Sequence, residues 1–289
     1  MSVIVTGSVA FDYLMTFPGH FRDHILLDRL DSLSLSFLVD GMVIQRGGTA
    51  ANIAYNLALL GERPLMVASV GRDFAEFRQW LEGKGVDTSH TREFESEYTA
   101  SFFANTDLSN AQIASFYPGA MRHAAELSLE QLAHPLGDVV VISPNEPDAM
   151  EKYVAECQEL GCSYFYDPSQ QVVRLDRDAL RLGIRGAAGL FANAYEFELL
   201  QKHGELSAGQ IIEQVPFLVV TRGPEGATIY EHGQVHEIPA FPERSNIDPT
   251  GVGDAFRAGF IKGYLAGLDW GTCGRMGALA ATYCLEARG

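Results

Sequence analysis

The chain has 289 residues, 47% of them hydrophobic and 20% charged, which supplies a full core and excludes a disordered chain or a coiled coil. Acidic residues outnumber basic ones by 37 to 21, for a formal net charge of −16, and such an acidic surface argues against a nucleic-acid partner. A small anionic ligand is compatible with this charge, because local backbone dipoles can hold it.

The cysteines and the apolar segments indicate the cellular compartment in which the protein is expected. Cys157, Cys162, Cys273 and Cys284 form no CxxC pair and no histidine cluster accompanies them, so we expect reduced core residues in a reducing compartment. No basic region precedes the first apolar run, and no run of about 18 uninterrupted apolar residues occurs, which argues against a signal peptide and a membrane span. We therefore expect a cytoplasmic protein without a membrane partner.

The first half of the chain mixes strands and helices in an irregular order. A β-branched run over 2–6 predicts a buried strand, and the apolar–polar alternation over 33–39 predicts a half-exposed one. Apolar residues at helical spacing predict one helix over 50–60 and a second helix that Asp73 caps and Gly83 ends. Further strands are predicted at 65–70, 99–104 and 112–117.

From residue 138 onward, strands and helices alternate regularly. Strands are predicted at 139–143, 163–167, 190–193 and 217–221, helices at 147–160, 196–202, 207–214, 254–266 and 270–285, and a hairpin at 227–239. This alternation predicts an α/β fold with a doubly wound, mostly parallel sheet flanked by helices. The strands near 13–45 and 95–118 do not fit that sheet, so we assign them to two insertions that build a small β-sheet lid on a single domain of residues 1–289.

The segment Asp-Pro-Thr-Gly-Val-Gly-Asp-Ala-Phe over 248–256 carries the strongest chemical signal. Gly251 and Gly253 open a predicted helix, whose bare amides and positive N-terminal end suit the charge on a transferring phosphoryl group. Asp254, at the start of that helix, can accept a proton from an attacking hydroxyl. The alternative is an Asp N-cap after a glycine turn. The chain contains no GxxxxGK[ST] loop, so this is not a P-loop.

Two polar segments in the first half lie where open α/β sheets bind ligands. Asp12 follows the first predicted strand, at its carboxyl end, and a loop cap is the alternative for it. Gly47 and Gly48 open the helix that carries Asn52 on its first turn. On their own, such helix-entry glycines indicate no more than a turn.

Two further segments follow strands in the second half. Asn193 and Glu196 can hold a hydrated Mg²⁺ through water, or form an N-cap pair. Thr221, Gly223 and Gly226 let a nucleotide approach the backbone, or simply make a turn. Because these segments fall at the ends of several predicted strands on one edge, chance is a poor explanation of the joint pattern.

These segments together resemble the signatures of the ribokinase-like (PfkB) carbohydrate kinases. Residues 248–259 resemble the C-terminal signature, and Gly47-Gly48 with Asn52, Leu60-Gly61 and Val70-Gly71-Arg72-Asp73 resemble the N-terminal one. The segments at 193–196 and 221–226 resemble the family's Mg-phosphate and nucleotide segments, and the resemblance covers nearly the whole chain in the correct order. Within the family, the strings at 34–40, 111–121 and 167–171 resemble those of bacterial adenosine kinases.

The resemblance implies ATP-dependent phosphorylation of the 5′-hydroxyl of adenosine to give AMP, with Mg²⁺ screening charge. It makes Asp254 the base and the amides around Gly251 and Gly253 the anion hole. It places the ribose and the rest of adenosine against Ser8, Asp12, Ser36, Gly48 and Asn52. It places ATP against Asn193, Thr221, Gly223 and Gly226, and Mg²⁺ against Glu196 through water.

A purine needs flat neighbours and a few polar contacts. Phe102 and Phe116 in the lid segments can sandwich a purine, whose stacking contributes roughly 1–3 kcal/mol per base. Gln170 or Gln171 can hydrogen-bond its polar edge. The alternative is that both phenylalanines belong to the core of the lid.

Three further expectations concern the chain end, a cation and assembly. The chain stops at 285–289, where family members continue with a segment that helps close the nucleotide site, so we expect the adenine side of the ATP site to be affected. Asp248 stands where some relatives bind potassium. The strand at 33–39 has an unprotected edge, which predicts a homodimer through the lid.

Two competing functions stay open. One is a kinase for another nucleoside or for a simple sugar such as ribose or fructose. The other is a catalytically weak nucleoside-binding protein, against which Asp254 and its two neighbouring glycines argue.

Overall fold

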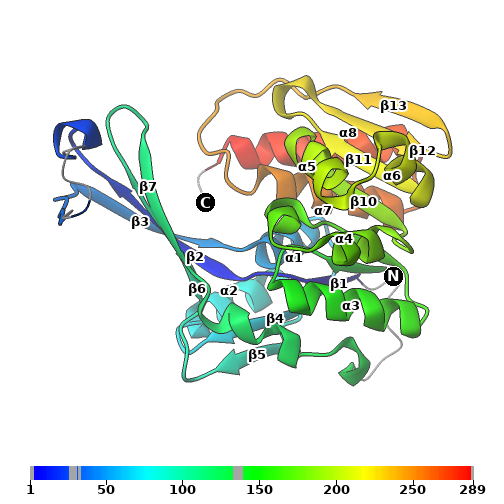
Figure 1. Cartoon of the computed structure of the whole chain (residues 1–289), viewed down its shortest axis with the longest axis horizontal. Helices are drawn as coiled ribbons and strands as arrows, with labels where there is room; N and C mark the ends of the chain where they lie inside the picture. The colour runs from blue at the N-terminus through cyan, green and yellow to red at the C-terminus, as the bar shows by residue number, and fades with distance from the viewer. Residues whose placement is uncertain (1–2, 26–30, 32–33, 133–138, 288–289) are drawn as a thin grey trace.

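The computed structural model describes residues 3–25, 31, 34–132 and 139–287 (Figure 1). The main sheet has the strand order β13-β12-β11-β10-β9-β8-β1-β4-β5. Its strands are β1 (Val3–Thr6), β4 (Leu65–Gly71), β5 (Thr91–Phe94), β8 (Val139–Ile142), β9 (Tyr164–Tyr166), β10 (Gly189–Asn193), β11 (Phe217–Thr221), β12 (Ala227–Glu231) and β13 (Gln234–Ile238). Neighbours are parallel from β11 to β5, and β12 and β13 add an antiparallel hairpin at one edge.

Helices cover both faces of the main sheet. One face carries α1 (Thr49–Leu59), α2 (Ala75–Lys84), α7 (Val252–Leu265) and α8 (Trp270–Leu285), and the other carries α3 (Pro147–Glu159), α4 (Arg177–Ile184), α5 (Ala194–Gly204) and α6 (Ala208–Gln214). Successive strand residues point into the two cores, as Ile4 and Val5 do. Burial on both faces explains the continuous apolar runs of these strands. The predicted doubly wound, mostly parallel sheet is therefore observed.

Two small-residue helices pack closely at the end of the chain. α7 and α8 lie side by side, and a Cβ on Gly259 would come within 2.5 Å of the Met276 carbonyl oxygen. Glycine at this crossing therefore allows the close approach of α7 and α8. None of the described helices is long and apolar enough to cross a membrane.

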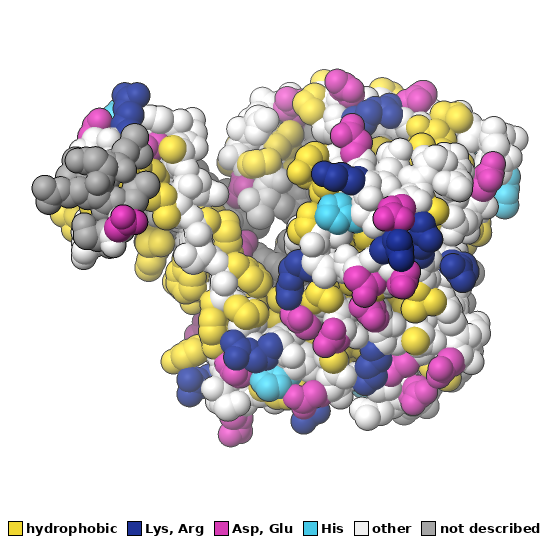
Figure 2. Space-filling model, in the orientation of Figure 1, with side chains coloured by type: hydrophobic (Ala, Val, Ile, Leu, Met, Phe, Trp, Pro, Cys, Tyr) yellow, Lys and Arg dark blue, Asp and Glu magenta, His cyan; other side chains and the backbone are white. Residues whose placement is uncertain are grey.

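A second sheet projects from the body, on the left in Figure 1. It has the order β3 (Gly41–Gly47), β2 (Ala10–Thr16), β6 (Ala100–Thr106) and β7 (Gln112–Tyr117). The β2–β6 pair is parallel and the other two pairs are antiparallel. Figure 2 shows hydrophobic side chains gathered along this four-stranded sheet. Its strands come from the two segments that we assigned to a lid; its closing over a ligand stays a prediction.

The strand predicted over 33–39 is wrong for 34–39, and residue 33 lies outside the described part. Residues 34–39 have no regular secondary structure, and the ladder with β2 begins only at Gly41. Phe37 packs its ring against Phe17 and Phe21, with centroids 5.0 and 4.9 Å apart. This aromatic cluster anchors the segment, so its apolar–polar alternation does not report a pleated strand.

The second helix also differs from the prediction at both ends. Asp73 does not cap it, because its Oδ1 accepts hydrogen bonds from the Thr99 amide (2.8 Å) and the Thr99 hydroxyl (2.7 Å). The helix runs through Gly83 and ends at Lys84, and Gly85 caps it in a left-handed conformation with a φ of 102°. The sequence prediction also gave no bounds for four of the described elements: the strands β2, β3 and β5 and the helix α4.

Candidate active site

Polar side chains from several parallel strands meet at the carboxyl edge of the main sheet. Ser8 follows β1, Asn145 follows β8, Asp167 follows β9, and Asn193 and Thr221 end β10 and β11. Such an edge is where open α/β sheets bind ligands. The sequence predicted this edge from the ends of the strands.

Backbone contacts of Ser8 and Gly48 fix the start of α1 against the end of β1. The Ser8 hydroxyl accepts from the Thr49 amide at 3.1 Å, and the Ser8 carbonyl accepts from the Ala50 amide at 3.0 Å. A Cβ on Gly48, whose φ is 92°, would lie 2.5 Å from the Val9 Cα. Only glycine permits this approach.

Asp12 lies in β2, so the alternative interpretation of Asp12 as a loop cap is wrong. It faces Gln45 of β3 across the ladder, and Gly47 leaves space for it, since a Cβ there would come within 2.6 Å of Asp12 Oδ2. Burial, and next the charge of Asp248, raise the pKa of Asp12 to about 6. When it is ionised, a buried carboxylate of this kind is a strong hydrogen-bond acceptor for hydroxyl groups.

Asp254 and Asn52 meet across 202 positions of sequence. Asn52 Nδ2 on α1 donates to Asp254 Oδ2 on α7 at 2.8 Å. Burial raises the pKa of Asp254, Arg257 and the Asn52 hydrogen bond oppose this rise, and Glu196 adds to it. An acid with a raised pKa and one oriented oxygen fits a proton acceptor.

The loop before Asp254 has free amides. α7 starts at Val252 with Gly251 as its N-cap in a left-handed conformation (φ 74°), so Asp254 is the third helical residue and not the first as predicted. In the described part of the chain the amides of Gly251, Gly253 and Asp254 have no acceptor. They are available to an anion at the positive end of the helix.

Arg257 and Asp167 form a buried ion pair that the sequence reasoning missed. Arg257 Nη2 donates to Asp167 Oδ1 at 2.8 Å, and Arg257 Nε pairs with Asp167 Oδ2. Burial raises the pKa of Asp167 to about 7 against the opposing pull of Arg257. The signal available was an arginine between apolar and small residues in the middle of this helix, together with an aspartate directly after a buried strand.

Asn193 and Glu196 form a capping box at the start of α5. Asn193 Oδ1 accepts from the Glu196 amide and Glu196 Oε2 accepts from the Asn193 amide, each at 2.8 Å, while Glu196 Oε1 accepts from the Ser169 hydroxyl at 2.9 Å. Among the described residues, no group of three or more His, Cys, Asp or Glu is placed to hold a metal ion. Any metal contact of Glu196 would therefore be shared with other ligands or made through water.

The glycines of the turn after β11 are required by the backbone conformation and by close packing. Gly226 has a φ of 88°, and a Cβ there would come within 2.0 Å of the Ile238 carbonyl oxygen. Gly223 (φ 55°) has open space around it, so its glycine serves the backbone conformation. Thr221 is half-buried at the end of its strand, next to this turn.

Phe102 and Phe116 lie opposite each other on β6 and β7, and Phe102 also lies opposite Asp12. Cross-strand partners point to the same face, so both rings share the face of Asp12. Phe116 is 51% exposed. Two rings on one face cannot sandwich a base, which corrects that expectation; they offer a one-sided platform.

The remaining predicted substrate residues are less well placed. Gln171 is buried and accepts from Arg174 Nη1 at 3.3 Å, while Gln170 beside it is exposed. Ser36 is exposed in 34–39 and has no hydrogen bond within the described chain. A further residue, Asn145, was missed by the sequence reasoning: it is 1% exposed, and its Nδ2 has no hydrogen-bond partner among the described residues.

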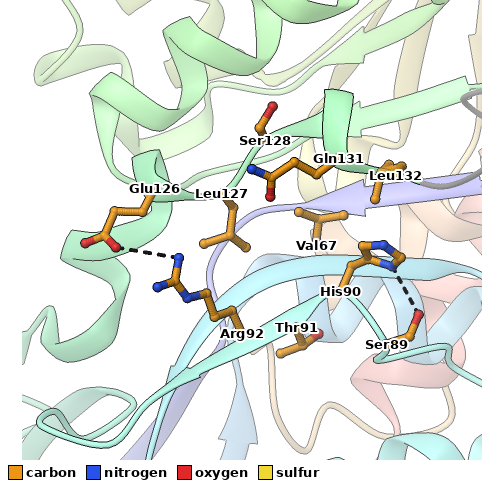
Figure 3. Close-up of a pocket in the computed structure, with 10 residues that line it drawn as sticks. All are labelled: Val67, Ser89, His90, Thr91, Arg92, Glu126, Leu127, Ser128, Gln131 and Leu132. Carbon is orange, nitrogen blue, oxygen red and sulfur yellow. Dashed lines mark hydrogen bonds and ion pairs between the residues drawn. The ribbon is translucent and has the colours of Figure 1, made fainter.

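Pockets lie on both sides of the molecule. One of about 360 Å³ opens between α1 and α8 and reaches Asn52 and Gly251. Another of about 260 Å³, drawn in Figure 3, lies between the start of β5 and the 3₁₀ turns around Leu127 and Gln131, and none of its lining residues belongs to the predicted site. Its Arg92 pairs with Glu126 at 3.6 Å.

The cysteines were predicted to be core residues, and two of them are. Cys157 and Cys273 are buried, whereas Cys162 and Cys284 are half-buried. Cys284 lies beside the loop that precedes α7, where its Sγ is 3.5 Å from the Thr250 carbonyl oxygen. Burial and the nearby Asp254 raise the pKa of Cys284 to about 11, so its thiol is neutral.

Residues 8–289 match the pfkB family of carbohydrate kinases. The chain belongs to this family. A nucleoside kinase of Methanothermobacter thermautotrophicus is 32% identical over 290 residues, which cover 99% of this chain and 90% of that relative.

Solved structures of nucleoside kinases agree with this assignment. Burkholderia thailandensis nucleoside kinase in complex with inosine has a TM-score of 0.88 and 34% identity, covering 99% of this chain and 92% of that one. Methanocaldococcus jannaschii nucleoside kinase, an archaeal member of the ribokinase family, has a TM-score of 0.89 and 28% identity, covering 100% and 92%. The predicted family and the ribokinase-like fold are confirmed.

Proposed function

We propose that this PfkB family kinase transfers the terminal phosphoryl group of ATP to the 5′-hydroxyl of adenosine, giving AMP and ADP in purine salvage. The observation that carries the proposal is Asp254, hydrogen-bonded to Asn52 beside free amides at the start of α7. A nucleoside acceptor is supported by relatives named nucleoside kinase, one of them solved with inosine and with ADP-inosine.

In the proposed reaction, carboxylates bind the acceptor hydroxyls and backbone amides bind the transferring phosphoryl group. Asp254 accepts the proton of the 5′-hydroxyl as its oxygen attacks the terminal phosphorus of ATP in line and ADP leaves. The amides around Gly251 and Gly253 stabilise the charge on the transferring group. Asp12 holds the ribose hydroxyls, beside Ser8 and Gly48.

The ATP side follows the ends of β10 and β11. Asn193, Thr221, Gly223 and Gly226 would contact the nucleotide there. Mg²⁺ bound to the phosphates would screen their charge. Each Glu196 oxygen keeps a lone pair beyond its protein hydrogen bond, so Glu196 fits a water-mediated contact. Asp248, which accepts from Gln45 Nε2 at 3.2 Å, stays the predicted neighbour of a monovalent cation.

Purine selectivity follows from the shared face of Phe102, Phe116 and Asp12. We expect wild-type kcat/KM for adenosine to exceed the value for ribose and fructose, because a sugar has no ring face to stack. Phe102→Ala should weaken adenosine binding by roughly 1–3 kcal/mol and affect ribose much less. Release of ADP, measured with adenosine, inosine, ribose and fructose for both proteins, tests this.

The matched control is Phe103→Ala. Phe103 is the neighbour of Phe102 on β6 and points to the opposite face of the sheet. There its ring stacks on that of Tyr13, with the two centroids 4.7 Å apart. Its loss should leave the substrate ratios unchanged. Equal losses for adenosine and ribose in Phe102→Ala would make Phe102 a packing residue and favour a sugar kinase, preference for inosine would favour another nucleoside, and binding without turnover would favour a nucleoside-binding protein.

Assembly through the four-stranded sheet is also part of the proposal. One edge strand of this sheet is β3 and not the segment 34–39, and its Met42, Val43 and Ile44 are 59%, 43% and 54% exposed. We expect a homodimer in light scattering at micromolar concentration, with twice the 31.6 kDa mass of the chain. Ile44→Lys should shift it to the monomer, and a monomeric wild type would contradict this expectation.

A further inference from the structure

A buried cation lies next to the proposed catalytic base. Arg257 is 8% exposed and follows Asp254 by three positions on α7, so both side chains lie on neighbouring positions of one helix face. Asp167 holds the guanidinium through two of its nitrogens. A Cβ on Gly253 would come within 2.7 Å of Arg257 Nη1, so glycine at this position lets the guanidinium lie under the first turn of α7.

The charges around Asp254 are mostly negative. The titratable groups that act on it are Arg257 on α7, Asp167 after β9, Glu196 on α5 and Cys284 on α8, and the neutral Asn52 on α1 donates to it. Asp248, in the loop ahead of α7, acts together with Asp254 on Cys284. Burial lowers the pKa of Arg257, but Asp167 and Asp254 outweigh burial and raise it. The guanidinium is therefore charged throughout the neutral range, and in the described part of the chain it is the cation that acts on Asp254.

We propose that Arg257 is a positioning residue, whose charge, fixed by Asp167, keeps the Asp254 carboxylate ionised and able to accept the proton of the acceptor hydroxyl. This inference rests on the proposed role of Asp254 as base. A carboxyl group in a desolvated site among other carboxylates favours its neutral form. A neutral Asp254 cannot accept a proton, so the cation beside it controls the pH at which the site works.

A purely structural role for the ion pair is the alternative, since it ties the end of β9 to α7. The two roles differ in what a neutral replacement does. Removing one partner leaves an uncompensated buried charge, whereas replacing both partners by neutral groups is often tolerated. The informative protein is therefore the double variant Arg257→Met/Asp167→Asn, with Arg257→Lys as the charge-conserving control.

Two measurements on full-length protein test the inference. The ¹³C carboxyl signal of Asp254, assigned by its loss in Asp254→Asn, gives its titration midpoint directly, and the pH profile of kcat/KM for adenosine gives the acid limb. In the double variant, we expect the Asp254 midpoint and the acid limb of kcat/KM to lie at higher pH by about one unit or more. Its kcat/KM should therefore be about tenfold or more below the wild-type value at low pH and should recover at high pH. Arg257→Lys should keep both near the wild-type values.

The results separate this inference from the proposed function. An unchanged Asp254 midpoint in a folded double variant would overturn the role of Arg257, even if Asp254→Asn abolished turnover. If the wild-type protein phosphorylated no nucleoside or sugar, the proposed function would fail, and the carboxyl titration would still decide whether Arg257 keeps Asp254 ionised. If the double variant did not fold, Arg257→Gln/Asp167→Asn, whose neutral side chains can hydrogen-bond to each other, would supply the same titration.

Discussion

Asp254→Asn is expected to lower kcat by about 10²–10⁴ and to leave adenosine binding nearly unchanged. The amide has the size and shape of the carboxylate, and its oxygen can still accept from Asn52 Nδ2, which lies 2.8 Å from Asp254 Oδ2. The site geometry is therefore kept. What is lost is the ability to accept a proton from the 5′-hydroxyl, which matters only as the reaction proceeds.

The measurements are ADP release at saturating adenosine and calorimetric binding of adenosine. Asp269→Asn is the matched control, because Asp269 stands at the start of the neighbouring helix α8 and caps it by accepting from the Thr272 amide at 2.9 Å. Asparagine is an equally good cap, so this variant should keep wild-type turnover. Near wild-type turnover in Asp254→Asn would remove Asp254 from the role of base.

Much of the fold could be predicted because its signals are local. A buried strand of a parallel sheet is a continuous apolar run between turns, and the prediction of 217–221 has the bounds of β11. The predicted helix 270–285 likewise has the bounds of α8. The segment 34–39 was misread because its apolar residues serve an aromatic cluster around Phe37, which periodicity does not distinguish from a sheet face. β5 escaped prediction because its four residues are partly exposed at the edge of the sheet.

The site could be predicted only where chemistry follows a local signal. The glycines and Asp254 stand together at a helix start, Asp12 comes a few residues after β1 along the chain, and Asn193 ends β10. The contacts that govern their chemistry are not local: Asn52 reaches Asp254 across 202 positions and Arg257 reaches Asp167 across 90. No spacing rule specifies such pairs, because they arise from how α1, α7 and the strand ends pack.

Asp12→Ala is the second variant with a large expected effect. A charged carboxylate that accepts from ribose hydroxyls contributes about 1.5–3 kcal/mol for each hydrogen bond, so losing two of them should lower kcat/KM by about 10²–10³ or more. The loss should be similar for adenosine, inosine and ribose, because all three present the same hydroxyls. Measured kcat/KM values for the three substrates check this, and a loss confined to nucleosides would place Asp12 against the base.

The pH dependence of Asp12 gives a second test of the same role. Burial, and next Asp248, raise its pKa to about 6, so wild-type kcat/KM should fall as the pH drops below that value and the carboxyl group takes up a proton. Folding has the opposite sign. Because the folded pKa lies above the ordinary value of 3.8, the folded state binds the proton more tightly, and Asp12 stabilises the fold less as the pH rises through this window.

Asp12→Asn separates these two effects, since it keeps the shape and removes the charge. We expect it to be more stable than the wild type above about pH 6, with the difference shrinking as the pH falls and vanishing below 3.8. Its kcat/KM should nevertheless be lower than that of the wild type above about pH 6, where the wild-type Asp12 is charged. Thermal unfolding at pH 4 and pH 8 checks the first expectation, and equal differences in melting temperature at both pH values would contradict it. A variant that gains stability and loses activity would show that the fold tolerates a destabilising buried carboxylate at this position because the substrate hydroxyls need it.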